Sequence, residues 1–214
     1  MDLAPLSQEQ LSSILTSAAT PSELYDTLSQ YEGQALLLAD SNGDQELLSL
    51  FYSFFFFSHL LIEELSEARM LTKRIPQNLV ENNSLLQNCT ILLRAVWQRS
   101  HEHVYRYLRE MPWPEPLEPL VQRYEVYFQN KTLEELSCTY EAIRPETAAS
   151  YLGLDSATAQ QGNPDILQKF TNCGWKWDGE AKLLHPKPIA PAHGPDDRNQ
   201  VKGLREVMVL LGKS

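Results

Sequence analysis

The residues that could do chemistry in this chain stand in short groups of histidines and carboxylates. His101-Glu102-His103 matches the start of a His-x-His zinc peptidase site. Such a site needs an aspartate about eleven residues further on as its third ligand, and Pro114 stands at that position. Two histidines at i and i+2 of a helix also point to different faces. We therefore interpret both histidines as polar surface residues.

The loop from Asp40 to Asp44 has the composition of a calcium site without its spacing. An EF-hand loop needs glycine at its sixth position and glutamate at its twelfth. Here Gly43 is fourth and Phe51 is twelfth, so we interpret the loop as a turn. A disulfide framework or a structural zinc site is excluded too, because the cysteines are few and widely spaced: Cys89, Cys138 and Cys173.

Motifs of nucleophilic and phosphate chemistry are absent from the sequence. There is no G-x-S-x-G elbow and no phosphate-binding G-x-x-x-x-G-K-[ST] loop. The acidic pairs Glu63-Glu64 and Glu134-Glu135 fall near expected helix ends, where carboxylates stabilise the helix dipole. The sequence therefore predicts a protein that is not an enzyme, with no catalytic residue, metal or cofactor.

The composition favours a globular helical protein. The 214 residues are 43% hydrophobic and 21% charged, and there are only nine glycines. The net charge of -10 argues against a nucleic-acid partner, because affinity for phosphates comes from clustered lysine and arginine. The first ten residues show no secretory signal, so we expect the protein in the nucleus and the cytoplasm.

The stretch from Leu47 to Pro76 is the element around which the fold must be organised. Its first part, with four phenylalanines from Phe54 to Phe57, is apolar on every side and predicts a buried helix. A break at Glu63 to Ser66 and a short basic helix closed by Pro76 complete a helical hairpin. We exclude a membrane span, because the flanks are acidic and four polar residues interrupt the apolar run: Ser49, Ser53, Ser58 and His59.

The same order of features recurs 36 residues later. The shift aligns EARMLTKRIP, residues 67–76, with HVYRYLREMP, residues 103–112. Two helices per unit and a period in the mid-thirties are typical of tetratricopeptide-like stacks. Chance similarity between two helical hairpins is the alternative.

Capping signals predict the remaining helices before residue 144. An amphipathic helix is expected over residues 7–19, and Thr20 with Glu23 forms a capping box for a second helix that reaches residue 39. A long helix is expected over residues 116–129. A further capping box, Thr132 with Glu135, predicts a new helix with this apolar face: Leu133, Leu136, Tyr140 and Ile143.

Residues 133–186 have the pattern of a winged helix. A short helix opens at Pro145 and ends at Gly153, a second region is capped by Asp155, and a third helix follows Pro164. Asp178-Gly179 lies between two alternating segments and predicts a β-hairpin. A nucleic-acid-binding winged helix is the alternative, although the third helix offers Lys169 as its only cation.

The last part of the chain predicts a helix that needs a partner surface. Prolines make residues 189–196 an extended linker. The following segment, residues 197–214, has apolar residues three and four positions apart: Val201, Leu204, Met208 and Leu211. Two arrangements remain open, in which this helix folds back on its own domain or joins a bundle with helices of other chains.

Four segments resemble the PCI-domain family, whose members are subunits of the proteasome lid, the COP9 signalosome and translation initiation factor three. They are EARMLTKRIP at 67–76, AVWQRSHEHVYRYL at 95–108, AASYLGL at 148–154 and CGWKWDGEAKLLHPKP at 173–188. These segments are most similar to the smallest PCI subunits of the signalosome. The chain departs from the family in a longer stretch at 157–166 and in its first forty residues.

The resemblance implies a mainly α protein without catalytic activity. Helical repeats would occupy residues 1–131 and a winged helix residues 132–188, followed by the linker and the terminal bundle helix. The chain would be a scaffold subunit of a hetero-oligomer, the signalosome, which removes NEDD8 from cullins. A PCI subunit of the proteasome lid or of translation initiation factor three is the alternative.

The resemblance also implies contacts with other PCI subunits through winged-helix edges and a bundle of terminal helices, without nucleic acid or membrane. An exposed wing would offer Trp175, Trp177, Leu183 and Leu184, and core packing is the alternative for both tryptophans. The terminal seam would offer Val201, Leu204, Met208 and Leu211. Two interpretations remain for Arg69, Lys73 and Arg74: they contact a partner, or they lie on a solvated helix face.

Overall fold

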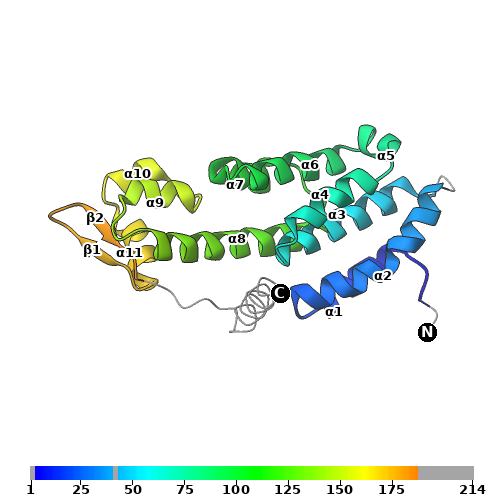
Figure 1. Cartoon of the computed structure of the whole chain (residues 1–214), viewed down its shortest axis with the longest axis horizontal. Coiled ribbons are helices and arrows are strands. Elements are labelled where there is room, and N and C mark those ends of the chain that lie inside the picture. Colours follow the sequence, from blue (N-terminus) through cyan, green and yellow to red (C-terminus); the bar gives the residue numbers. More distant parts are fainter. Residues whose placement is uncertain (1–2, 41–42, 188–214) are drawn as a thin grey trace, which may run out of the picture.

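A computed structural model describes residues 3–40 and 43–187, and this part of the chain is mainly helical. It contains eleven helices and one two-stranded antiparallel sheet (Figure 1). This agrees with the expected fold class, helical repeats followed by a winged helix with a small wing. The linker 189–196 and the terminal segment with Val201, Leu204, Met208 and Leu211 lie outside the described residues.

Helix α1 (Gln8–Ser17) lies within the range predicted for it, and α2 (Pro21–Asp40) begins directly after the predicted cap Thr20. The capping box at the start of α2 is complete. The backbone N–H of Glu23 donates to Thr20 Oγ1 at 3.2 Å, and Glu23 Oε2 accepts from the backbone N–H of Thr20 at 3.1 Å.

Helix α3 (Gln45–Leu61) is the buried centre of the helical stack. Every residue from Leu47 to Leu61 is buried, and α2, α4, α6 and α8 all pack against this helix. Its polar residues fit because Ser53 and Ser58 donate their hydroxyls to carbonyls within the helix, at 2.7 Å each. No helix in the described part of the chain is both long and apolar enough to span a membrane.

The 36-residue repeat is confirmed in the backbone. A shift of 36 residues places α3 on α6 (Ser84–Trp97) and α4 (Leu65–Arg74) on α7 (His101–Glu110). The last residues of α3 and α6 then coincide, and α4 and α7 coincide at both their first and their last residues. A short helix, α5 (Gln77–Glu81), joins the two hairpins and was not predicted.

The turn inside each hairpin repeats in atomic detail. Glu63 and Arg99, which occupy the same place in the two units, have positive φ values of 66° and 53°. Each turn is closed by the same type of hydrogen bond, from Glu64 N to His59 O in the first unit and from Ser100 N to Ala95 O in the second, both at 3.0 Å. Such agreement in capping geometry argues against chance similarity.

Helix α8 (Glu118–Thr139) is one continuous helix, and the prediction of two helices here is wrong. Neither glycine nor proline occurs between Pro119 and Thr139, and Thr132 is buried rather than capping. Tyr140 ends the helix, and Ile143 forms a β-bridge with Leu184 instead of extending a helical face. The predicted boundary between residues 131 and 132 thus falls inside α8.

The winged helix follows the predicted order. Three short helices, α9 (Pro145–Tyr151), α10 (Ser156–Gln160) and α11 (Pro164–Asn172), precede strands β1 (Lys176–Asp178) and β2 (Leu183–His185). The register pairs Lys176 with His185 and Asp178 with Leu183. The turn is longer than the Asp-Gly signal predicts, since Asp178 pairs within the strand and its Oδ1 accepts from the backbone N–H groups of Glu180 and Ala181.

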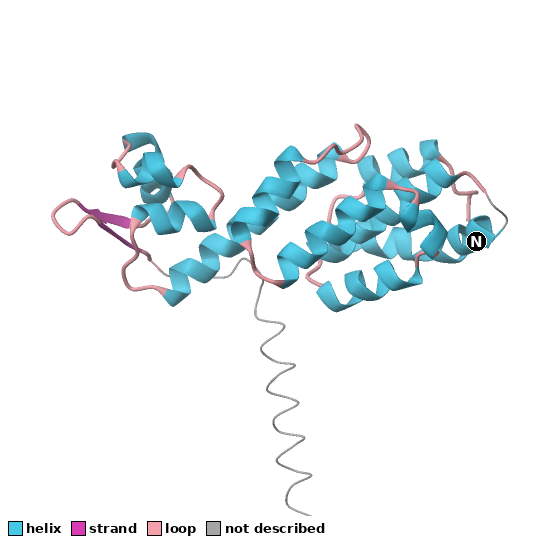
Figure 2. Ribbon diagram, turned by 90° about the horizontal axis from the view of Figure 1, so that it is seen from above, coloured by secondary structure: helices cyan, strands magenta, loops and turns pink. Residues whose placement is uncertain are grey.

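Two hydrophobic cores lie at opposite ends of the elongated described part, and α8 contributes to both (Figures 1 and 2). The first core centres on α3, and the second lies under the winged helix. The helical stack and the winged helix contact each other at Gly153, whose φ is +63° and which lies against the ring of Tyr105 in α7. Arg109 of α7 donates to Gly153 O at 2.7 Å, and Gln129 of α8 donates to Leu152 O at 2.9 Å. These bonds fix the winged helix on the stack.

Candidate docking surfaces

The wing has one open edge. Ile143 pairs with β2, β2 pairs with β1, and the outer side of β1 has no strand partner within residues 3–40 and 43–187. An open strand edge presents backbone N–H and C=O groups that another strand can pair with. The wing therefore has the geometry to extend its sheet with a strand from another chain.

Trp175 and Leu184 are not part of this exposed surface, so the prediction of an exposed wing is wrong for them. Trp175 is 2% exposed, stacks on Phe170 with ring centroids 5.2 Å apart, and donates its Nε1–H to Ser137 Oγ at 3.0 Å. Leu184 is fully buried in the same core. Core packing, the alternative for the tryptophans, holds for Trp175, because a small domain needs this large side chain to close its core.

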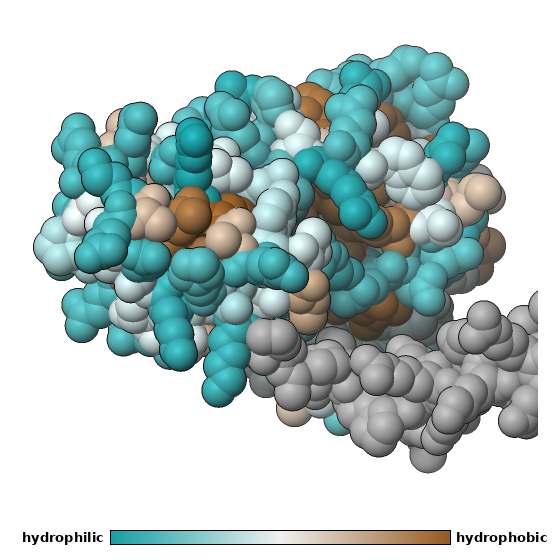
Figure 3. Space-filling model, turned by 60° about the vertical axis from the view of Figure 1, so that its left-hand side comes forward, coloured by the Kyte–Doolittle hydropathy of each residue, from teal (hydrophilic) through white to brown (hydrophobic). Residues whose placement is uncertain are grey.

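Trp177 and Leu183 remain partly exposed, and their role as partner contacts stays a prediction. Both line a cavity of about 540 Å³ between the hairpin and helices α9 and α10. Pro145 and Ala181 add apolar surface to this cavity, and Arg144 adds a positive charge. Figure 3 brings the winged-helix end forward and shows a small group of apolar side chains surrounded by polar ones.

The three basic residues of α4 differ in their surroundings. Arg74 is engaged within the chain, since its Nε lies 2.9 Å from Glu32 Oε1 and its Nη1 lies 3.8 Å from Glu67 Oε2. The guanidinium of Arg69 lies over the ring of Trp97 in α6, 5.5 Å from the ring centroid. Lys73 is exposed. A contact between any of them and a partner stays a prediction.

Glu63, in the turn of the first hairpin, bonds to α8. It accepts hydrogen bonds from the hydroxyl of Tyr127 and from Lys131 Nζ. Burial and these contacts raise the pKa of Tyr127 far above its ordinary value. Glu63 therefore ties the first repeat turn to the long helix.

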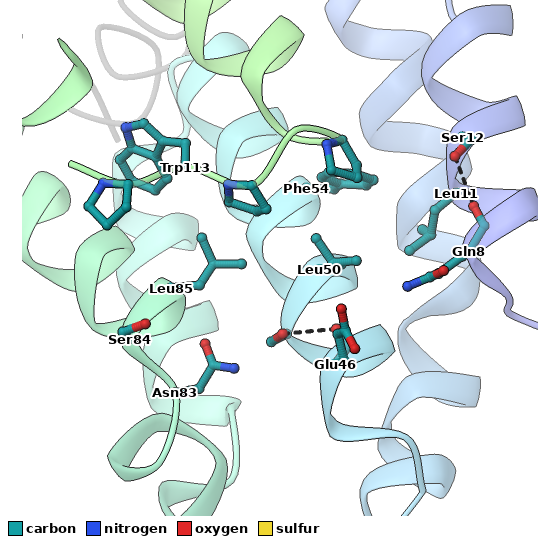
Figure 4. Close-up of a pocket in the computed structure, with 14 residues that line it drawn as sticks. Gln8, Leu11, Ser12, Glu46, Leu50, Phe54, Asn83, Ser84, Leu85 and Trp113 are labelled. Atoms are coloured by element: carbon teal, nitrogen blue, oxygen red, sulfur yellow. Dashed lines mark hydrogen bonds between the residues drawn. The ribbon is translucent and has the colours of Figure 1, made fainter. Parts of the chain in front are cut away.

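A groove in the helical stack was not predicted from the sequence. Its volume is about 460 Å³, and it lies between α1, α3 and α6, with the segment 112–116 across one end (Figure 4). Leu11, Leu50, Phe54, Leu85 and Trp113 form its apolar part, and polar residues surround them. These side chains come from four separate segments, so no local pattern in the sequence indicates the groove.

The histidines that could suggest metal chemistry have other contacts. His101 packs edge-on against Tyr151 at 5.0 Å, and His103 Nδ1 lies 2.6 Å from Ser100 Oγ. In the described residues, no three of the metal-ligating types His, Cys, Asp and Glu are grouped in a way that would hold an ion. On α11, the recognition helix of the alternative nucleic-acid reading, the exposed Lys169 is accompanied by the exposed Asp165.

The sequence of the chain is similar to a family of known proteins. The CSN8/PSMD8/EIF3K family model matches residues 46–193. A protein of Emericella nidulans named COP9 signalosome complex subunit 8 is 52% identical over 212 residues, which cover 99% of this chain and 98% of that protein. Proteins of the same name from Dictyostelium discoideum and Xenopus laevis are 26% and 25% identical, over 79% and 72% of this chain and 83% and 76% of their own.

Proposed function

The chain belongs to the CSN8/PSMD8/EIF3K family, and from this membership we propose that it is a non-catalytic assembly subunit of a COP9 signalosome. The observation that carries the proposal is the 52% identity, over nearly the whole of both chains, to a protein that bears this subunit's name. In this role the chain takes part in removing NEDD8 from cullins, while another subunit holds the catalytic centre.

The described surfaces support a docking role. The open edge of β1 is suited to pair with a strand of a neighbouring winged helix, and Trp177 of β1 and Leu183 of β2 have partly exposed apolar side chains. The junction at Gly153 supports this role too, because it holds the wing in a fixed direction relative to the helical stack. A subunit that orders its neighbours needs such rigidity more than it needs a reactive group.

We further propose that the terminal segment 197–214 contributes a helix to a bundle with other subunits, and that the protein occurs in nucleus and cytoplasm. The seam Val201, Leu204, Met208 and Leu211 supports the bundle. Microscopy of a fluorescent fusion expressed at the natural level tests the location, and exclusion of the signal from either compartment would contradict it.

Mass spectrometry of the proteins that co-purify with the full chain, tagged at its natural level, tests the proposed function. Signalosome subunits in amounts comparable to the chain are the expected result. Subunits of the proteasome lid or of translation initiation factor three would keep the family and move the function to proteolysis or translation. A chain that purifies alone would overturn the proposal and favour the nucleic-acid alternative.

A further inference from the structure

Six exposed residues of α4 and α6 form one surface of the helical stack, which we call the α4/α6 face: Arg69, Met70, Lys73, Ile91, Arg94 and Trp97. The two helices pack against each other, and the guanidinium of Arg69 over the ring of Trp97 joins their exposed sides. Three large apolar residues are exposed here, Met70 at 48%, Ile91 at 39% and Trp97 at 51%.

The positive charges of this face are not balanced by ion pairs within the described part of the chain. The salt bridges found there use Arg74, Arg109, Lys131 and Arg144, and none uses Arg69, Lys73 or Arg94. Glu67, an acidic residue of α4, is directed to Arg74. Three cations are thus left for solvent or a ligand in a chain whose net charge is -10.

A solvated helix face explains Lys73 but not the residues beside it. Arg69 and Lys73 lie at i and i+4 of one helix, where like charges repel. An exposed tryptophan next to an arginine is typical of binding surfaces, because aromatic and arginine side chains are enriched there and contribute much of the binding free energy. The contact with Trp97 also restricts the guanidinium of Arg69, so that less side-chain entropy is lost when its N–H groups pair with a carboxylate.

We propose that the α4/α6 face binds an acidic segment of a partner protein in which carboxylates stand next to an aromatic or aliphatic residue. The carboxylates pair with Arg69, Lys73 and Arg94, and the apolar side chain packs on Trp97 between Met70 and Ile91. The wing forms one end of the described chain, away from α4 and α6 in the helical stack (Figure 1). The chain can therefore hold a neighbour at its wing and a second, acidic segment on its stack.

Selection from a phage-displayed library of random peptides tests the class of ligand. The bait is the full-length chain, and counter-selection uses the double variant Arg69→Glu/Lys73→Glu. We expect enriched peptides that combine aspartate or glutamate with an aromatic or aliphatic residue. If no peptide depends on the two basic residues, or if the enriched peptides carry no acidic residue, the proposal is wrong.

Fluorescence anisotropy with the dominant selected peptide tests the individual residues. We expect the Kd to rise about tenfold or more in Arg69→Glu/Lys73→Glu and in Trp97→Ala, and less in Trp97→Phe, which keeps an aromatic face. Two variants at exposed positions elsewhere serve as matched controls, Lys169→Glu for charge and Leu37→Ala for apolar surface, with a Kd within about twofold of the parent. Equal losses in the controls would overturn the assignment.

Two further ligands complete the test: vesicles that contain phosphatidylserine, and, separately, a DNA duplex of random sequence. Binding of the full-length chain to each is measured. The proposal requires both to bind more weakly than the peptide at about 0.15 M salt. Tighter binding of either one, lost in Arg69→Glu/Lys73→Glu, would show a site for phosphate groups rather than for an acidic protein segment. These measurements use no other subunit, so their failure is distinct from a failure of the proposed assembly role.

Discussion

His59 is a buried histidine whose surroundings favour its neutral form. It lies in α3 between the rings of Tyr25 and Phe55, with centroids 5.1 Å and 4.6 Å away, and its ring nitrogens have no hydrogen-bond partner in the described chain. Burial lowers the pKa of His59 from 6.5 to about 4, and the positive charge of Arg74 acts in the same direction. The neutral ring is thus the form that fits the core.

The free energy of unfolding should therefore fall as the pH drops from 6.5 towards 4. In this window the unfolded chain takes up a proton on His59 that the folded chain does not, so protonation favours unfolding. We expect a loss of about 3 kcal/mol between pH 8 and pH 4 from this residue. Urea unfolding at several pH values measures it.

The variant His59→Leu isolates this contribution. Its stability should depend less on pH than that of the parent, because leucine carries no titratable group. His101 adds to the same trend, because burial also lowers its pKa. Identical pH profiles of His59→Leu and the parent chain would show that His59 does not titrate in this way.

At the scale of elements, Gly153 is a position where the helical stack and the winged helix are closely joined. A Cβ added there would lie 2.4 Å from the ring of Tyr105, and the φ of +63° disfavours any side chain. We expect Gly153→Ala to lower the free energy of unfolding by about 2 kcal/mol or more, through strain and displacement of the Tyr105 ring.

Gly162→Ala is the matched control for this prediction. Gly162 has a similar φ of +74°, but an added Cβ meets nothing within 4 Å, so its cost should be about 1 kcal/mol from the backbone alone. Thermal unfolding of both variants measures the difference. Limited proteolysis in the α9–α10 region should be faster in Gly153→Ala only, and equal effects in the two variants would contradict a role for the contact with Tyr105.

Most elements of the fold could be predicted from local signals. The 36-residue repeat follows from the order of apolar and basic segments, and the caps at Thr20 and Asp155 follow from side chains that reach nearby backbone N–H groups. The continuity of α8 could not be predicted in this way. A capping-box pattern such as Thr132 with Glu135 is also compatible with a helix interior, and burial of Thr132 decides between the two.

The candidate surfaces were less predictable than the elements, because exposure depends on contacts between distant segments. The spacing of Trp175 and Trp177 predicts one shared strand face, yet Trp175 lies before β1 and is covered by Phe170 and Ser137, while Trp177 in β1 remains partly exposed. Arg69 and Trp97 are 28 positions apart, and only the packing of α4 on α6 brings them together. Sequence spacing identifies the helix face of each residue, but not which faces meet.

At the scale of the whole molecule, the open edge of the wing should be needed for assembly but not for folding. We expect the double variant Trp177→Asp/Leu183→Asp to fold, with less than about 2 kcal/mol lost, because both side chains are only partly buried. It should no longer co-purify with other subunits at the parent's level. The new carboxylates in the wing would have to lose their water against the apolar surface of a neighbouring subunit, which costs binding free energy. Circular dichroism and quantitative mass spectrometry measure the two effects.

A pair of substitutions on the stack separates this effect from a general loss of solubility or charge balance. Leu36→Asp/Leu37→Asp introduces the same charges at exposed leucines of α2, and co-purification should stay at the parent's level. If the wing variant still assembles normally, the edge of β1 is not a docking surface. If both variants fail, the added charge rather than its position is responsible.

Deletion of residues 197–214 distinguishes the two arrangements that the sequence leaves open for the terminal helix. If the helix joins a bundle with other subunits, the shortened chain should keep its unfolding midpoint and lose its partners, because an isolated seam adds little to the stability of its own domain. If the helix folds back, the deletion should expose apolar surface and lower the midpoint. The substitution pair Leu204→Asp/Met208→Asp should reproduce either outcome without shortening the chain, since it removes the seam alone. An unchanged midpoint together with unchanged assembly would contradict both arrangements and leave docking to the wing and the helical stack.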